Sequence, residues 1–229
     1  MGNMQAGRVW RLGGVSVGAW LTVLSPAWAE PVHCSQGGSV TQVRTASLLD
    51  VIPPALLLPV SGFPEVQVRV LETYNYSQSQ SAKLERILPL MRTALNSEAL
   101  RDFVLNHVYR GKKQFSDSEG LTNGMIFERL RNAIEERFEN ERYIAEFRTE
   151  LYYTRRGTVG YTTSAWPSWI MTNTKFFSPW SESEVAGHLV HEWLHLIGFS
   201  HYETFDYSVP YAVGEEVARI AKAALAQER

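Results

Sequence analysis

The sequence predicts a domain of the α+β class, in which a small mixed sheet is combined with a central helix and a C-terminal helix. Segments rich in β-forming residues lie at 66–70 and 147–172, whereas apolar residues at helical spacing occupy most of 82–140. A third stretch, 181–197, joins a helix start signal to apolar residues around most of the helix, which is typical of a buried helix. The composition, 45% hydrophobic and 12% aromatic, is that of a chain with a proper core.

The first 29 residues have the pattern of an export signal. A short basic region is followed by an apolar stretch from Leu12 to Leu24, and Ala27-Trp28-Ala29 forms a small-residue cleavage site. The apolar stretch is too short to span a bilayer, which needs roughly 20 residues. We therefore expect residues 1–29 to be removed and the protein to be exported, to the periplasm or the extracellular space, without a membrane anchor.

About 200 residues remain after that cleavage, enough for one domain. Residues 30–65 are weakly patterned and contain several prolines, so we expect an extended N-terminal segment, followed by the domain at 66–229. One cysteine, Cys34, excludes an internal disulfide. The formal net charge of -2 and the lack of a basic patch argue against a nucleic-acid partner.

The first half of the domain is expected to contain one strand and three helices. Valines at 66, 68 and 70 alternate with polar residues and predict a half-buried strand. Helical patterns follow at 82–95, 97–109 and 123–140, and Pro89 should kink the first helix or mark its early end. The polar segment 111–123 is expected to be a solvated connection.

Strands are expected again immediately before the central helix. The segments 147–153, 158–163 and 169–172 are rich in β-formers, and a glycine-containing turn separates the first two. Ser181 and Glu184 then form a capping box at the start of the central helix. An amphipathic pattern over about Val213 to Gln227 predicts the C-terminal helix.

The central helix carries a group of residues with metal-binding spacing. His191 and His195 are four residues apart and project from one face of a helix, where two imidazoles can share a tetrahedral zinc ion. Gly198 tolerates the left-handed backbone that ends a helix, so the chain can reverse and bring His201 back as a third nitrogen ligand. Glu192 is offset around the helix, beside the metal position rather than on it. Three protein ligands leave a fourth position open, which is the catalytic pattern.

The pattern HExxHxxGxxH at 191–201 resembles the zinc signature of the metzincin metallopeptidases. The resemblance implies a zincin-like fold, a Zn2+ cofactor, and hydrolysis of a peptide or protein substrate with Glu192 as general base. Metzincins have a methionine in a turn below the zinc, but no methionine follows Met171 here. Residues 207–211 stand in the comparable place, with Pro210 at the expected methionine position. Tyr211 matches the tyrosine that, in some metzincins, stabilises the developing oxyanion; a tyrosine packed in the turn is the alternative.

The resemblance also implies an edge strand that binds the peptide substrate as an added strand, at Gly160–Thr163 or Trp169–Asn173. Two interpretations of Cys34 remain open: an unpaired thiol, or a latency ligand that fills the open zinc position, as in some metzincin proforms. We expect His188 to have a packing role or to support the ligands, and Asp206 to orient a ligand imidazole. Two other functions stay open, a zinc amidase acting on cell-wall peptides and a non-catalytic zinc-binding scaffold.

Overall fold

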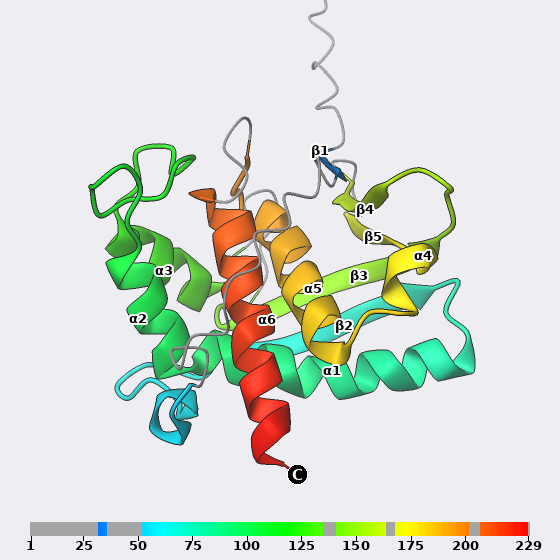
Figure 1. The fold of residues 1–229 in the computed structure, drawn as a ribbon, viewed down its shortest axis with the longest axis horizontal. Helices are drawn as coiled ribbons and strands as arrows, with labels where there is room; N and C mark the ends of the chain where they lie inside the picture. Colours follow the sequence, from blue (N-terminus) through cyan, green and yellow to red (C-terminus); the bar gives the residue numbers. More distant parts are fainter. Residues whose placement is uncertain (1–31, 36–51, 135–140, 164–167, 202–206, 229) are drawn as a thin grey trace, which may run out of the picture.

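A five-stranded mixed sheet is the framework on which the helices pack (Figure 1). The computed structural model describes residues 32–35, 52–134, 141–163, 168–201 and 207–228. The strands are β1 (Val32–Ser35), β2 (Gln67–Tyr74), β3 (Ile144–Tyr152), β4 (Thr158–Thr162) and β5 (Trp169–Asn173), in the spatial order β1-β4-β5-β3-β2. Strands β2 and β5 run parallel to β3, whereas β4 runs antiparallel to both β5 and β1. The prediction of an α+β fold with a small mixed sheet is confirmed.

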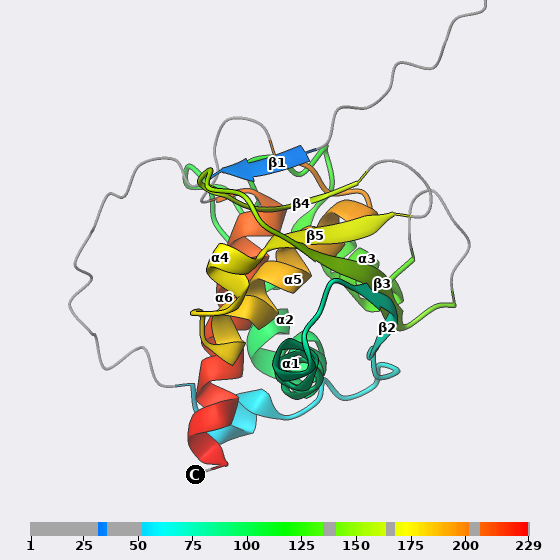
Figure 2. The ribbon, with the colours of Figure 1, turned by 90° about the vertical axis from the view of Figure 1, so that its right-hand side faces the viewer.

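Helices α1 and α5 pack against this sheet, and α6 packs against both of them (Figure 2). The helices are η2 (Pro54–Leu57), α1 (Gln78–Asn96), α2 (Glu98–Asn106), α3 (Asn123–Asn132), α4 (Thr174–Phe177), α5 (Glu182–Leu196) and α6 (Val209–Gln227). Helix α5 contacts α1, α6, β4 and β5, so it lies at the centre of the molecule. The predicted C-terminal helix is present as α6. No helix within the described ranges has the length and apolar character needed to cross a membrane.

Two of the predicted segments lie wholly or partly outside the described residues. The export signal at 1–29 lies outside them, and within the N-terminal segment at 30–65 the structure describes 32–35 and 52–65. The alternating valines of the domain behave as predicted: Val66 is buried, and Val68 and Val70 pack half-buried against the core.

Helix α1 differs from its prediction at Pro89. It begins earlier, at Gln78, behind a capping box made by Ser77 and Gln80, and it continues through Pro89 to Asn96. Proline removes one backbone hydrogen bond from a helix. The turn is nevertheless held because Ile87 and Met91 on either side of it are completely buried. Of the two outcomes predicted at Pro89, a kink or an early end of the helix, the early end was wrong, because core packing outweighs the local cost.

Two helix boundaries also differ. Helix α3 ends at Asn132, not 140, because Ala133 adopts a left-handed conformation with φ 54° and donates its N–H to the Arg129 carbonyl. Residues 135–140 lie outside the described part of the chain. Helix α6 begins at Val209, four residues before the predicted start at Val213.

The segment 111–123 is more than a solvated connection. Its Phe115 is buried and stacks on the ring of His107, with centroids 4.0 Å apart and planes within 8°. Its Ser116 donates a backbone hydrogen bond of 2.9 Å to the Tyr207 carbonyl. The prediction failed because the segment is mostly polar and Phe115 is its one aromatic residue. The stacking of Phe115 and the hydrogen bond of Ser116 hold the loop beside the start of α6.

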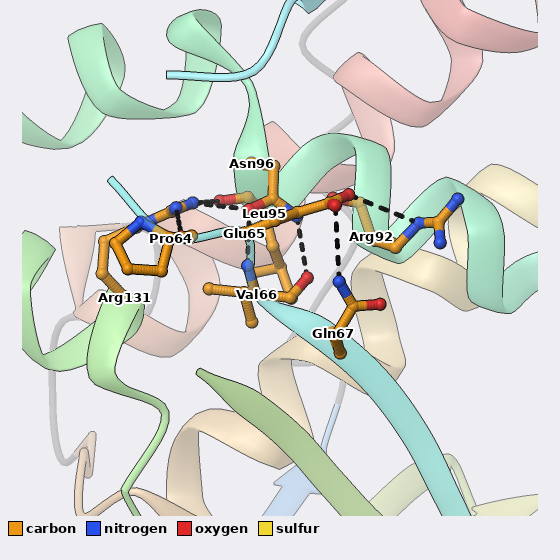
Figure 3. Close-up of polar contacts among 8 residues, drawn as sticks. All are labelled: Pro64, Glu65, Val66, Gln67, Arg92, Leu95, Asn96 and Arg131. Atoms are coloured by element: carbon orange, nitrogen blue, oxygen red, sulfur yellow. Dashed lines mark hydrogen bonds and ion pairs between the residues drawn. The ribbon is translucent and has the colours of Figure 1, made fainter. Parts of the chain in front are cut away.

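A buried polar cluster joins α1, α3 and the start of β2 (Figure 3). Arg131, 3% exposed, donates to the Asn96 side-chain oxygen at 2.7 Å, the Leu95 carbonyl at 3.2 Å and the Pro64 carbonyl. Asn96 in turn exchanges two hydrogen bonds of 2.8 Å with the backbone of Val66. The cluster therefore fixes the position of residues 64–66, which lead into β2.

Candidate metal centre

Three histidine side chains converge at one end of α5. His191 and His195 lie one turn apart on the helix, and His201 returns to them from the loop that follows. One ring nitrogen from each histidine lies within 4.8 Å of the others, so the three could bind a metal ion. The ring centroids are 5.0–5.4 Å apart. The structure thus brings together the three residues that the sequence motif singled out.

The end of α5 explains how His201 returns. Gly198 has φ +90°, a left-handed conformation that favours glycine. Its N–H donates to the His195 carbonyl at 3.2 Å, and the N–H of Phe199 donates to the Leu194 carbonyl at 3.0 Å. These two bonds form a Schellman motif, which ends the helix and reverses the chain.

The three rings are held in their neutral form by burial. Burial lowers the pKa of His195 to about 4 and the pKa of His191 well below its usual value. Burial also lowers the pKa of His201, although the nearby Asp117 carboxylate acts in the opposite direction. Neutral imidazoles keep a lone pair for a metal, so these pKa shifts suit a set of metal ligands.

The two nitrogens of His195 have different surroundings. Nδ1 lies 2.7 Å from the Phe199 carbonyl, which makes it the protonated donor. Nε2 is buried, and it has no hydrogen-bond partner among the described residues. A buried nitrogen without a partner is unfavourable, and a metal ion bound at Nε2 would satisfy it.

The start of α6 forms the floor of the cluster. Pro210, where a methionine was expected, is buried in the first turn of the helix, and its backbone accepts a hydrogen bond from His191. The ring of Tyr211 packs on His191 at 4.5 Å and on His201 at 4.8 Å between centroids. Residues 209–211 form the first turn of α6, so the turn expected at 207–211 was wrong for these three residues.

Glu192 follows His191 on α5 and is completely buried. Its Oε2 is 3.0 Å from the hydroxyl of Thr162 on β4, and the same hydroxyl is 2.9 Å from the Glu192 carbonyl oxygen. Sequence reasoning missed Thr162 because no local pattern links a threonine on a strand to a helix thirty residues later. The contact exists only because β4 crosses α5.

His188 occupies a buried position one turn before Glu192. Its Nε2 lies 3.1 Å from the Thr172 hydroxyl on β5, and its Nδ1 lies 3.8 Å from Glu192 Oε1. The ring fits because β4 carries Gly160 at the crossing, where a Cβ atom would lie 2.6 Å from the ring. His188 is thus not one of the three converging histidines, in agreement with its predicted secondary role.

The loop at 111–120 closes one side of the centre. Ser200, next to His201, donates a hydrogen bond of 2.8 Å to Glu119 of that loop. This proximity was not predicted from the sequence. Asp206, expected to orient a ligand imidazole, lies outside the described residues, and so does the side chain of Cys34.

Neither of the two candidate edge strands lies at an edge of the five-stranded sheet, in which β1 lies outside β4. Strand β5 lies between β4 and β3, so both of its sides are filled. The outer side of β4 is paired antiparallel with β1 (Figure 2). In this pairing Val32 lies opposite Thr162, and Cys34 lies opposite Gly160. An extended segment of this chain therefore already lies along the strand that passes over Glu192.

Comparisons with protein-family models, with curated proteins and with solved structures find no match for this chain.

Proposed function

We propose that the protein is an exported zinc metallopeptidase of metzincin-like type, with a zincin-like fold. His191, His195 and His201 would hold the zinc ion, and Glu192 would act as general base. The observation that carries the proposal is the convergence of three buried histidine rings at the end of a helix that also carries the buried carboxylate of Glu192, next to His191 in the chain. A site that only stabilises the fold has no use for such a carboxylate, whereas a hydrolase needs a base next to the metal.

The donor set favours zinc over harder metals. Three imidazole nitrogens without a carboxylate ligand suit zinc, whereas magnesium and calcium prefer oxygen. The buried Nε2 of His195 has no other partner in the described part of the chain, which fits a ligand role. Bound zinc would supply Lewis acidity, lowering the pKa of a water molecule to roughly 7 and polarising a carbonyl group.

The residues of the chain have separate tasks in this proposal. Glu192 accepts a proton from the attacking water and returns it to the amide nitrogen that leaves. The ring of Tyr211 contacts His191 and His201. Its hydroxyl donates a hydrogen bond to the carbonyl oxygen of the substrate as negative charge develops there. Attack by water is direct, without an acyl-enzyme.

Substrate would bind along β4. In the structure β1 is paired with the outer side of β4, so an extended peptide would bind there by taking the place of β1. Main-chain pairing would place the peptide over Thr162 and Glu192 with little demand on its sequence. Export to the periplasm or the extracellular space is part of the proposal and rests on the signal pattern at 1–29.

The test is cleavage of a diverse peptide library by the zinc-loaded protein beside two variants. Glu192→Ala should retain zinc and lose cleavage, because the base is removed while the ligands remain. His195→Ala should lose zinc as well, measured by metal analysis of the purified protein, and a chelator should abolish cleavage by the wild type.

Two results would contradict the proposal. Cleavage by Glu192→Ala at the wild-type rate would exclude the base role. A wild-type protein that holds one zinc ion but cuts neither the library nor purified cell wall would be a non-catalytic zinc protein.

A further inference from the structure

The carboxylate of Glu192 is contacted from the sheet through one of its oxygens. The Thr162 hydroxyl lies 3.0 Å from Oε2 and 2.9 Å from the backbone oxygen of the same residue, and all of these groups are buried. A threonine side chain is short and has few rotamers. Its single hydroxyl proton is shared between these two acceptors of one residue, so the hydroxyl holds both the backbone and the carboxylate of Glu192 near β4.

The other oxygen faces His188. Nδ1 of His188 is 3.8 Å from Oε1, an electrostatic contact longer than a hydrogen bond, and Nε2 is 3.1 Å from the Thr172 hydroxyl. A neutral imidazole carries one proton, so only one of these nitrogens can be the donor. If Nδ1 carries the proton, the N–H is directed toward the carboxylate and Thr172 donates to Nε2. The other tautomer would direct a lone pair at a carboxylate oxygen, which is electrostatically unfavourable.

The site is built to hold this ring. His188 is buried, and burial lowers its pKa to about 4, with the neighbouring His195 acting in the same direction. Gly160 pairs directly with Thr172 across β4 and β5. A Cβ atom at Gly160 would lie 2.6 Å from Cε1 and 2.7 Å from Nε2 of His188. The missing side chain on β4 thus leaves the space in which His188 reaches Thr172.

We infer that Thr162, His188 and Thr172 form a positioning network that holds the carboxylate of Glu192 in one orientation beside the three metal-binding histidines. Thr162 acts on one oxygen, and Thr172 acts on the other through the Nδ1–H tautomer of His188. The contacts of Thr162 and His188 described above lead to the Glu192 carboxylate, so the network acts through Glu192. The effect on rate rests on the proposed peptidase function, whereas the tautomer and the carboxylate orientation are properties of the protein alone.

The first arm of the test compares Thr162→Val with Thr162→Ser. Valine has nearly the same shape but no hydroxyl, whereas serine keeps the hydroxyl, so the pair separates hydrogen bonding from packing. We expect Thr162→Val to lose roughly 10- to 100-fold in kcat, as for other residues that orient a reacting group, with KM and zinc content unchanged. Thr162→Ser should recover most of that loss. Equal kcat values for the two variants would overturn the role of Thr162.

The second arm does not depend on activity. Long-range ¹H–¹⁵N NMR spectra of the histidine rings, recorded with and without zinc, should show His188 protonated at Nδ1. In Thr172→Val the Nε2 resonance should shift, because its hydrogen-bond donor is lost, while Thr172→Ser should leave it in place. A proton on Nε2 of wild-type His188 would overturn the network. If the wild type cuts no peptide, the tautomer still decides this inference, so its failure and that of the proposed function are distinguishable.

Discussion

At the scale of single residues, Arg131 is a buried cation whose hydrogen-bond acceptors in the described part of the chain are neutral oxygens. It ties the last turn of α1 to the segment before β2, as Figure 3 shows. Burial lowers the pKa of its guanidinium group, with Glu65 acting in the opposite direction. Removing this group would leave the Pro64 and Leu95 carbonyls without that donor in the interior.

We expect Arg131→Met to lower the free energy of unfolding by about 2 kcal/mol, because methionine fills the space of the stem but donates no hydrogen bond. Denaturant unfolding of the metal-free protein measures this change. Arg92→Met is the matched control: Arg92 is 50% exposed, and its ion pair with Glu65 is 3.7 Å long, so its removal should have little effect. Equal destabilisation by the two substitutions would contradict a structural role for the buried cluster.

At the scale of elements, α5 and α6 approach closely at two glycines. A Cβ atom on Gly187 would lie 2.5 Å from the Gly214 carbonyl oxygen and 2.8 Å from the Ala218 side chain. A Cβ atom on Gly214 would lie 3.0 Å from the Cβ of His191. This contact lets the first turn of α6 pack under the three converging histidines.

Gly187→Ala should therefore destabilise the protein by about 1–2 kcal/mol, because overpacking outweighs the better helix propensity of alanine. It should also weaken zinc binding, since α6 carries the Pro210 and Tyr211 contacts to His191. Thermal unfolding and competition with a chromogenic chelator measure the two effects. Gly124→Ala in α3 is the control, because the nearest atom to its Cβ would be 3.8 Å away, and it should be neutral or slightly stabilising. A Gly187→Ala protein as stable as the Gly124→Ala protein would refute the close contact.

At the scale of the whole molecule, buried histidines link stability to pH. Their pKa values in the folded protein lie below the ordinary value of 6.5, and for His188 and His195 they fall to about 4. Between these values the unfolded chain binds more protons than the folded protein. The stability that the folded protein gains from keeping these histidines neutral is therefore complete above pH 6.5, and it is lost as the pH falls toward 4.

For the metal-free protein we expect the free energy of unfolding to fall between pH 6.5 and 5 by about 1 kcal/mol per pH unit for each of these two histidines. Urea unfolding across this range, with chelator present, measures the slope. The His195→Asn variant lacks one of the two groups and should show a shallower slope. The same slope in wild type and variant would show that His195 does not contribute.

Local sequence was sufficient for the features that depend on near neighbours along the chain. The capping box at Ser181, the i,i+4 spacing of His191 and His195, and the glycine that ends the helix at 198 all act within a few residues. Their geometry follows from helix periodicity and backbone conformation, so the sequence alone predicted the helix and the return of the third histidine.

Contacts between distant segments were decided only by the tertiary structure. Thr162 reaches Glu192 because β4 crosses α5, and Pro89 stays within α1 because the core holds that turn. The polar loop that closes over His201, and the strand β1 beside β4, likewise depend on how whole elements pack. Such contacts have no period or spacing in the sequence, because they join residues whose distance is set by the sheet and the core rather than by the chain.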